Sequence, residues 1–278
     1  MKNSLLFFLL LLTAGAFSQN VNIPDANFKA YLVDNIEINT NGDSEIQVSE
    51  ASSFNSTMYA NSLSISDLTG IEAFTALTLL KCNDNQLTSL DVSQNISLTS
   101  LNCNVNQLTS LNLNQNIALI SLNCNENQIT SLDLSQNMAL EDLSCGSNQL
   151  TSLDVSQNTA LYVLWCPENQ LSCLNVSNGN NINFWQMYAS DNLDLSCIEV
   201  DDENWATTNW GDDSPISYSE DCNNDCSTST VGITEITSSK TRIQILDMLG
   251  RETSFQSNTP LIYVYDDGST EKVYRVSF

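Results

Sequence analysis

Histidine is absent from all 278 residues, which removes the side chain that most often serves as a general base or a metal ligand. Cationic side chains are scarce as well. From residue 19 to residue 230 only Lys29 and Lys81 occur, against 27 acidic residues, which gives this segment a net charge of −25. Such a segment repels a phosphate backbone, so nucleic acid is excluded as a partner. No apolar run is long enough to cross a bilayer, so we expect no transmembrane segment.

Residues 1–18 have the pattern of a secretory signal peptide. Lys2 supplies the positive start, residues 5–12 form the apolar stretch, and Ala16 and Ser18 provide a small-residue cleavage site before Gln19. The alternative is a membrane anchor, which the short apolar stretch disfavours. The pattern therefore predicts an exported protein.

A short internal repeat dominates the chain. Five evenly spaced cysteines mark it, at Cys82, Cys103, Cys124, Cys145 and Cys166. Around each the pattern is L-x-x-L-x-C-x-x-N-x-[LI]-x-x-L-x-[VL]-x-x-N. This period is too short for an independent domain and too long for a coiled-coil heptad, so each repeat is one turn of a solenoid. Degraded copies at both edges extend the pattern to seven turns over residues 58–200, with caps at 19–57 and 201–226.

Alternation within each turn predicts how the turns stack. Leu101 and Cys103 face inward and Asn102 faces outward, as in a short β-strand. One such strand per turn, placed about 4.8 Å above the previous one, builds a parallel sheet over a continuous core. Two columns of asparagines fall in register at the bends, and we interpret both as structural amides that bond buried backbone groups. The fold class predicted is an α/β solenoid.

The repeat resembles leucine-rich-repeat proteins, and among them the bacterial internalins. Residues 65–80, ISDLTGIEAFTALTLL, are similar to the 22-residue internalin repeat, and the 21-residue cysteine turns resemble those of the internalin J type, in which the thiols form a ladder. The resemblance covers about half of the chain. It implies a curved right-handed superhelix with a parallel concave β-sheet that recognises partners, usually proteins or glycans.

The nine cysteines fall into two groups. We expect the five cysteines of the repeat to be core thiols, because a metal–thiolate stack would lack the tetrahedral clustering that zinc needs. Cys173 and Cys197 occupy the same place in consecutive turns, LSCLNV and LSCIEV, which predicts a disulfide between them. Cys222 and Cys226 are then the second pair. The other two connectivities of these four cysteines stay open.

The amino-terminal cap contains a candidate calcium loop. A short helix is predicted at residues 26–33, and oxygen-bearing side chains follow at Asn39, Asn41, Asp43 and Glu50, with the spacing of an EF-hand loop. Asn39 and Ser44 depart from the Asp and Gly of that motif. The alternative is a hydrogen-bonded turn without metal. No other cofactor is expected.

The outward residues of the strands form the predicted binding surface. They are small and polar in the middle, at Asn102 and Asn123, and aromatic towards the carboxyl end, where Tyr162, Trp165, Trp185 and Tyr188 fall on two adjacent turns. Exposed rings beside asparagines suit sugar stacking or a protein contact. The alternative is that these rings pack under the carboxy-terminal cap.

The carboxy-terminal segment forms a separate unit. A linker is predicted at 227–235, a strand at 242–249, and a β-hairpin from strands at 261–265 and 273–276. Residues 243–252, 258–269 and 271–276 resemble the type A sorting domain of the type IX secretion system of Bacteroidetes. Residues 236–278 would then engage that machinery, be removed, and leave the protein secreted or attached to the outer-membrane surface. The alternative is a small β-module that closes the solenoid.

Together these features predict an exported binding protein rather than an enzyme. One alternative is a glycoside hydrolase that uses paired carboxylates, for example Asp142, Glu168 or Asp191. Regular solenoid turns disfavour it, because they offer no deep pocket that excludes water. A structural or adhesive spacer without a specific ligand is the third alternative.

Overall fold

The computed structural model describes residues 19–210, 216–222, 226, 242–247, 251, 261–265 and 270–273. The predicted signal peptide at 1–18 and linker at 227–235 lie outside the described residues. The chain divides into two units, Met1–Thr228 and Ser229–Phe278.

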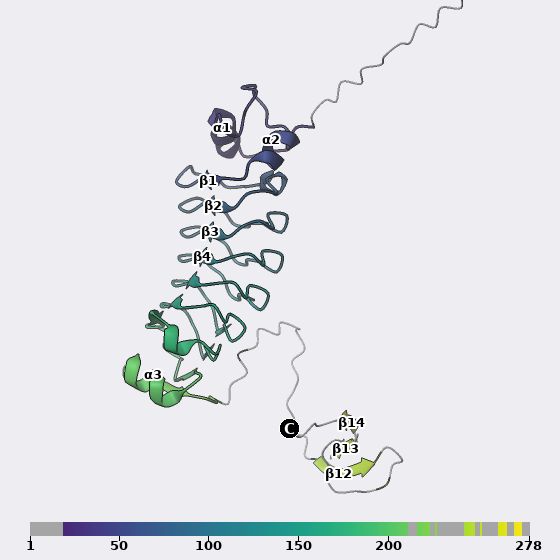
Figure 1. Ribbon diagram of the computed structural model, residues 1–278, viewed down its shortest axis with the longest axis vertical. Helices are drawn as coiled ribbons and strands as arrows, with labels where there is room; N and C mark the ends of the chain where they lie inside the picture. Colours follow the sequence, from purple (N-terminus) through teal and green to yellow (C-terminus); the bar gives the residue numbers. More distant parts are fainter. Residues whose placement is uncertain are drawn as a thin grey trace, which may run out of the picture. The chain divides into compact units, whose positions relative to one another are not determined.

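Stacked turns build the first unit, and each places one short strand on the same side of the stack (Figure 1). Within the described residues, seven of these strands form a parallel sheet, in the order β1-β2-β3-β4-β5-β7-β9. They are β1 (Thr57–Tyr59), β2 (Leu79–Lys81), β3 (Ser100–Asn102), β4 (Ser121–Asn123), β5 (Asp142–Ser144), β7 (Val163–Trp165) and β9 (Gln186–Tyr188). The structure confirms the predicted leucine-rich-repeat solenoid with a parallel sheet on its concave face.

The strands form because their middle residues bury apolar side chains. Leu101 pairs in register with Leu122, and Leu122 with Leu143. These leucines are at most 1% exposed, as is each cysteine that follows its strand. Full burial of one leucine contributes roughly 2 kcal/mol, and each turn repeats this contribution at the same place.

Both predicted asparagine columns are present, and they bond backbone groups of successive turns. In the column after the main sheet, Asn127 donates to the carbonyls of Cys103 and Cys124 and accepts from Leu108 N. At the far bend, Asn137 donates to the carbonyls of Leu113 and Asn116. These amides connect one turn to the next where no strand pairing is available.

Each turn leaves the main sheet through a residue with positive φ. The φ values are 56° at Asp84, 52° at Val105, 53° at Glu126 and 51° at Ser147. This left-handed conformation costs an L-residue about 1 kcal/mol or more. The asparagine one position later, which bonds the carbonyls around the bend, compensates for that cost.

A second, four-stranded parallel sheet was not predicted from the sequence. It contains β6 (Ser152–Asp154), β8 (Cys173–Asn175), β10 (Cys197–Glu199) and β11 (Ser217–Ser219), in the order β11-β10-β8-β6. The prediction of one strand per turn is therefore wrong for the last turns. Leu153, Leu174 and Ile198 lie in register and are buried, so the apolar alternation around them supports a second strand.

The short α-helices lie at the two ends of the solenoid and not in its turns. At the amino end lie α1 (Ala26–Asp34), as predicted, and α2 (Val48–Ser53). Asp25 caps α1 by accepting hydrogen bonds from Asn27 N and Phe28 N. The turns contain the short 3-10 helices η1 (Ile71–Ala73) and η2 (Asn181–Asn183), because so short a repeat leaves little chain for a return helix. At the carboxyl end lies α3 (Glu203–Asn209).

The second unit contains a three-stranded antiparallel sheet of β12 (Arg242–Asp247), β13 (Leu261–Tyr265) and β14 (Thr270–Val273). The predicted hairpin is present as β13 and β14, with Leu261 opposite Val273. Its second strand begins at Thr270, three residues earlier than predicted. Residues 274–276 lie outside the described part. Among the described residues, no helix has the length and apolarity that crossing a bilayer requires.

Candidate functional site: an aromatic end on the concave sheet

The outward residues of the main sheet form a continuous column, which we call the outer column. Register pairs join each member to the next, and neighbours on adjacent strands lie roughly 4.8 Å apart. The column runs through Tyr59, Lys81, Asn102, Asn123, Ser144, Trp165 and Tyr188. Its order along the sheet is as predicted, so the solenoid converts a regular interval in the sequence into direct spatial contact.

The four predicted aromatic residues lie on two adjacent turns at the carboxyl end of this column, and two of their rings are in contact. The rings of Trp165 and Tyr188 are stacked, with centroids 4.6 Å apart and an interplanar angle of 17°. Tyr162 and Trp185 precede the same two strands, and Trp185 N donates to the Tyr162 carbonyl at 2.9 Å. Trp185 is 81% exposed, Tyr188 43% and Tyr162 40%. We call these four residues the aromatic patch.

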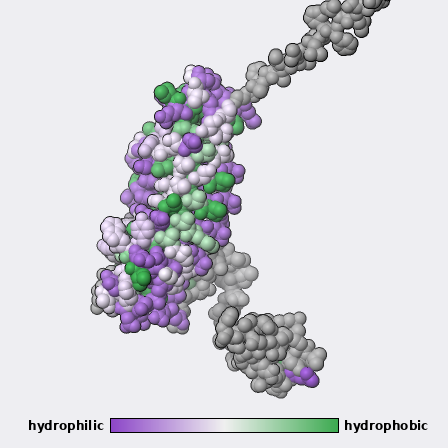
Figure 2. Space-filling model, viewed as in Figure 1, coloured by the Kyte–Doolittle hydropathy of each residue, from purple (hydrophilic) through white to green (hydrophobic). Residues whose placement is uncertain are grey.

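A different set of rings packs under the carboxy-terminal cap. Trp210 lies 5.5 to 5.7 Å from the ring centroids of Trp205, Phe184 and Tyr218, and the last two are buried. The rings that pack under the cap are therefore not those of the aromatic patch, three of which are exposed. The face visible in Figure 2 is mostly hydrophilic and carries hydrophobic residues as scattered groups.

Two carboxylates that were not among the predicted binding residues, Glu141 and Asp142, lie on the turn before the aromatic patch. The Glu141 carbonyl accepts from Tyr162 N at 3.0 Å, and Asp142 pairs in register with Val163. Both side chains are half-buried. Partial burial raises the pKa of the Asp142 carboxyl. The available signal was that the two preceding turns carry Ser100 and Ser121 at the position of Asp142.

Asn102 and Asn123, also predicted to bind ligand, lie on the same sheet but not beside the rings. Their strands β3 and β4 are separated from β7 by β5. The Oδ1 of Asn102 accepts from Asn104 N at 3.2 Å, and that of Asn123 accepts from Asn125 N at 3.2 Å. Part of their hydrogen-bonding capacity therefore serves the bend, and their role in binding stays a prediction.

The five cysteines of the repeat are free thiols inside the core, each 0% exposed. Burial raises the pKa of Cys82, Cys124 and Cys166 to about 12. Burial, together with the neighbouring thiols of Cys82 and Cys124, raises the pKa of Cys103 well above its ordinary value. These thiols are therefore protonated and unreactive at neutral pH, as core residues.

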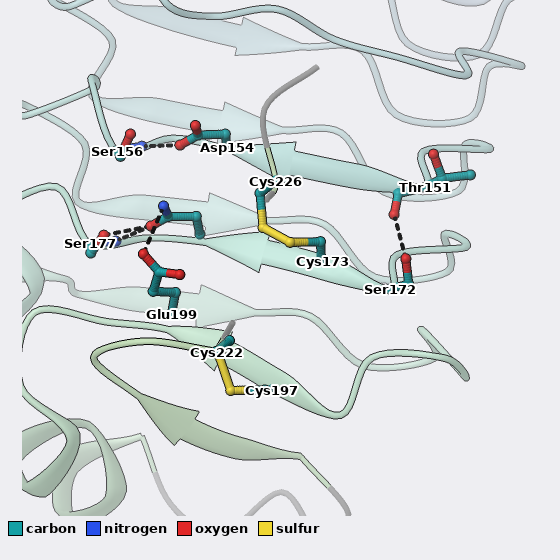
Figure 3. The surroundings of a disulfide bond; sticks show 11 residues. Thr151, Asp154, Ser156, Ser172, Cys173, Ser177, Cys197, Glu199, Cys222 and Cys226 are labelled. Carbon is teal, nitrogen blue, oxygen red and sulfur yellow. Dashed lines mark hydrogen bonds between the residues drawn. A yellow bond between two sulfur atoms is a disulfide. The ribbon is translucent and has the colours of Figure 1, made fainter. Parts of the chain in front are cut away.

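The predicted disulfides Cys173–Cys197 and Cys222–Cys226 are wrong. The structure instead has Cys173–Cys226 and Cys197–Cys222, with Cα–Cα distances of 5.4 and 5.9 Å (Figure 3). Cys173 and Cys197 do begin neighbouring strands, β8 and β10. Each nevertheless bonds a cysteine of the cap segment, so the two bonds attach this segment to the second sheet. Sequence spacing alone could not show that the cap segment supplies the partners of both Cys173 and Cys197.

The residues of the candidate calcium loop are near one another but use their oxygens within the protein. The Glu50 carboxylate accepts four hydrogen bonds, from Thr40 N, Thr40 Oγ1, Asn41 N and Gln47 N. Asn39 Oδ1 accepts from Gly42 N, and Asp43 accepts from Asn41, Glu45 and Gln47. Three of the four donors to Glu50 bond Oε1 and one bonds Oε2, so both oxygens are already engaged and the carboxylate is not prepared for bidentate metal binding. These contacts favour the hydrogen-bonded turn.

The carboxylates that suggested a hydrolase do not form an enclosed pair. Asp142 lies on the main sheet, whereas Glu168 and Asp191 follow β7 and β9 at the positive-φ bends. Glu168 Oε2 accepts a hydrogen bond from Ser147 Oγ at 2.8 Å. Within the described residues, no group of three or more Cys, Asp or Glu residues could hold a metal ion.

The stacked turns and their parallel sheet define a leucine-rich-repeat solenoid, and known structures share this fold. The chain is similar to the functional domain of InlJ from Listeria monocytogenes, which includes a cysteine ladder (28% identity, TM-score 0.41, 66% of this chain and 52% of that one). It is also similar to the internalin inlF of that organism (22% identity, TM-score 0.51, 68% of this chain and 55% of that one). A third similar structure is internalin C2 of the same organism (19% identity, TM-score 0.47, 67% of this chain and 100% of that one). The chain thus spans about half the length of the first two. No protein-family model and no curated protein matches it.

Proposed function

We propose that this protein is exported and binds a partner, a protein or a glycan, on the concave face of its main sheet without catalysing a reaction. The aromatic patch is the observation that carries the proposal. Two stacked rings and two further exposed rings on a rigid sheet present a large contact area, and little side-chain entropy is lost when a partner covers them.

The rigidity of the site supports recognition of a defined partner. Trp165 and Tyr188 lie on β7 and β9, whose middle residues, Leu164 and Met187, pair in register over the core. Because the backbone of both strands is fixed by parallel pairing and by the buried column beneath it, the rings are held before a partner arrives.

A binding screen with matched variants tests the proposal. The full chain is applied to a glycan array and to a panel of purified cell-surface ectodomains, beside Trp165→Ala, Tyr188→Ala and the control Tyr59→Ala. Tyr59 belongs to the same outer column at the opposite end of the sheet. We expect ligands whose binding falls about tenfold or more in the first two variants and is unchanged in the control. Equal binding by all four proteins, or no ligand at all, refutes the proposal.

We further propose that the carboxy-terminal unit is a sorting domain that the type IX secretion machinery recognises, which leaves the protein secreted or attached to the outer-membrane surface. Two disulfides fit an oxidising destination outside the cytosol. The test is the mass of the protein recovered from the medium or the surface of the producing cells. We expect a chain that starts at Gln19 and lacks residues 236–278, and an intact 278-residue mass would contradict both expectations.

A further inference from the structure

Cationic groups are confined to one end of the solenoid. No lysine or arginine occurs between Lys81 and Lys240. Of the two cations in residues 19–210, Lys29 forms an ion pair with Glu45 at 2.7 Å, and Lys81 Nζ lies 5.4 Å from the ring centroid of Tyr59. The carboxyl half of the main sheet therefore has no cation of its own within residues 82–210.

The two ends of the outer column contrast in this respect. At the amino end, the aromatic ring of Tyr59 has a cation over its face, supplied by the next strand. At the carboxyl end, Trp165 and Tyr188 stack on each other, and the neighbouring strand offers Ser144 instead of a lysine. Aromatic faces attract cations through the ring quadrupole, most strongly for tryptophan. This part of the column lacks the group that its other end already has.

Two carboxylates lie on the turn next to these rings: Glu141 beside Tyr162, and Asp142 beside Val163, two residues before Trp165. Neither Glu141 nor Asp142 has a side-chain hydrogen bond or ion pair with any described residue, although both are half-buried. Other acids of the solenoid are bonded, for example Asp91 by Ser93 N and Asp154 by Ser156 N. Partial burial disfavours the ionised form of Asp142 and raises its pKa, and a cation placed beside it would reverse that effect.

We infer that the partner bound at the aromatic patch presents an arginine- or lysine-rich segment, whose cations cover the rings of Trp165 and Tyr188 and pair with Glu141 and Asp142. The inference rests on the proposed function and specifies the chemistry of the ligand. Arginine suits the site best, because its planar guanidinium both stacks on aromatic rings and forms paired hydrogen bonds with a carboxylate. The net charge of −25 over residues 19–230 also attracts such a segment from a distance.

The test measures binding of a fluorescein-labelled nona-arginine peptide to the full chain by fluorescence anisotropy at 150 mM NaCl. The variants are Asp142→Ser and Trp165→Ser, which copy the residues that neighbouring turns carry at these positions, Ser121 and Ser144. We expect each substitution to weaken binding about fivefold to tenfold, since a cation–π contact or a partly buried ion pair contributes roughly 1 kcal/mol.

The matched control is Asp133→Asn, which removes one negative charge elsewhere. Asp133 is exposed, lies in the return segment outside the main sheet, and is replaced by Asn112 at the same place one turn earlier. We expect this variant to bind the peptide within about twofold of the unmodified chain, because salt screens a distant charge. Equal loss in Asp133→Asn and Asp142→Ser would show attraction to the whole acidic surface and overturn the inference, as would no binding of the peptide.

Different results would refute the binding function and the cationic chemistry of the partner. A neutral glycan whose binding is lost in Trp165→Ser and kept in Asp142→Ser would retain the binding function and refute the cationic partner. A ligand of any kind that binds Trp165→Ser as tightly as the unmodified chain would refute the function itself. Circular dichroism of each variant confirms that the solenoid remains folded before binding is compared.

Discussion

Two asparagines of the same turn, Asn127 and Asn137, provide a quantitative test of how the turns are held together. Asn127 Nδ2 donates to three carbonyls at 3.1 Å, and its Oδ1 accepts from Leu108 N at 2.9 Å. Asn137 Nδ2 donates to two carbonyls, at 3.2 and 2.9 Å, while its buried Oδ1 has no partner among the described residues. We predict that Asn127→Ala destabilises the protein more than Asn137→Ala.

The size of the stability loss depends on which backbone groups lose their last hydrogen-bond partner. The three carbonyls bonded by Asn127 each keep a second donor, namely Asn106 Nδ2, Asn148 Nδ2 and Val105 N. Leu108 N has no other acceptor among the described residues, so Asn127→Ala leaves one buried N–H unpaired, at a cost of about 1–3 kcal/mol. Asn137→Ala leaves no backbone group unpaired, because Asn116 N and Leu119 N still bond the two carbonyls, and it removes an unpaired oxygen.

Both substitutions remove the same atoms from a buried site, so the cavity contribution largely cancels in the difference. We expect Asn127→Ala to unfold at a temperature about 4–8 °C below Asn137→Ala, for a difference of about 2 kcal/mol in the free energy of unfolding. Thermal and urea unfolding followed by circular dichroism measure it. Equal stability, or a less stable Asn137→Ala, would refute the reasoning that unpaired donors rather than lost bonds set the cost.

Three further predictions concern cysteines and the amino-terminal cap. The five repeat cysteines should resist a thiol reagent at pH 8 in the native protein and react within minutes after denaturation, since burial raises the pKa of every one of these thiols. Rapid native labelling of all five would contradict the core assignment. Non-reducing peptide mapping should link Cys173 to Cys226 and Cys197 to Cys222. The closed loops of 53 and 25 residues predict that these disulfides stabilise the fold by about 4 and 3.5 kcal/mol. A peptide in which Cys173 is linked to Cys197 would show the pairing to be incorrect. Burial raises the pKa of the Glu50 carboxyl, but its hydrogen bonds outweigh burial and lower this pKa overall. Glu50→Gln should therefore cost about 2 kcal/mol of unfolding free energy at pH 7, and progressively less as acid protonates the carboxylate. A melting-temperature gap that widens in acid, or a melting temperature that rises with added calcium, would count against the hydrogen-bonded turn.

The regular part of the fold was predictable because the repeat period determines which residues lie on adjacent turns. Cysteines at a constant interval, with leucines at fixed offsets, define which residues stack, and the register pairs of β3 to β5 follow that interval. Stacking of the turns also predicted that Trp165 lies beside Tyr188. Their interval is longer than the repeat period, but the strand pattern around Met187 is still recognisable in the sequence. Stacking alone was enough to locate the aromatic patch.

Features that depend on irregular segments were not predictable in the same way. The pairing of Cys173 and Cys197 depends on the path of the cap segment after β11, which no repeat describes. The second sheet begins only at β6, although the earlier turns have similar residues at the same place. Spacing placed Glu50 in an EF-hand pattern, but its hydrogen bonds to Thr40 and Gln47 required coordinates.

The repeated bonding between turns means that the length of the main sheet can change only in whole steps. Removal of residues 103–123 would join Asn102 to Cys124 and leave each remaining cysteine turn with its asparagine at the bend and its leucine in the strand. The distance between Lys81 and Trp165 would then shorten by one strand spacing, roughly 4.8 Å. A partner that touches both positions would therefore be sensitive to the number of turns between them, and variants with one turn fewer or one more would measure how far along the sheet that partner extends.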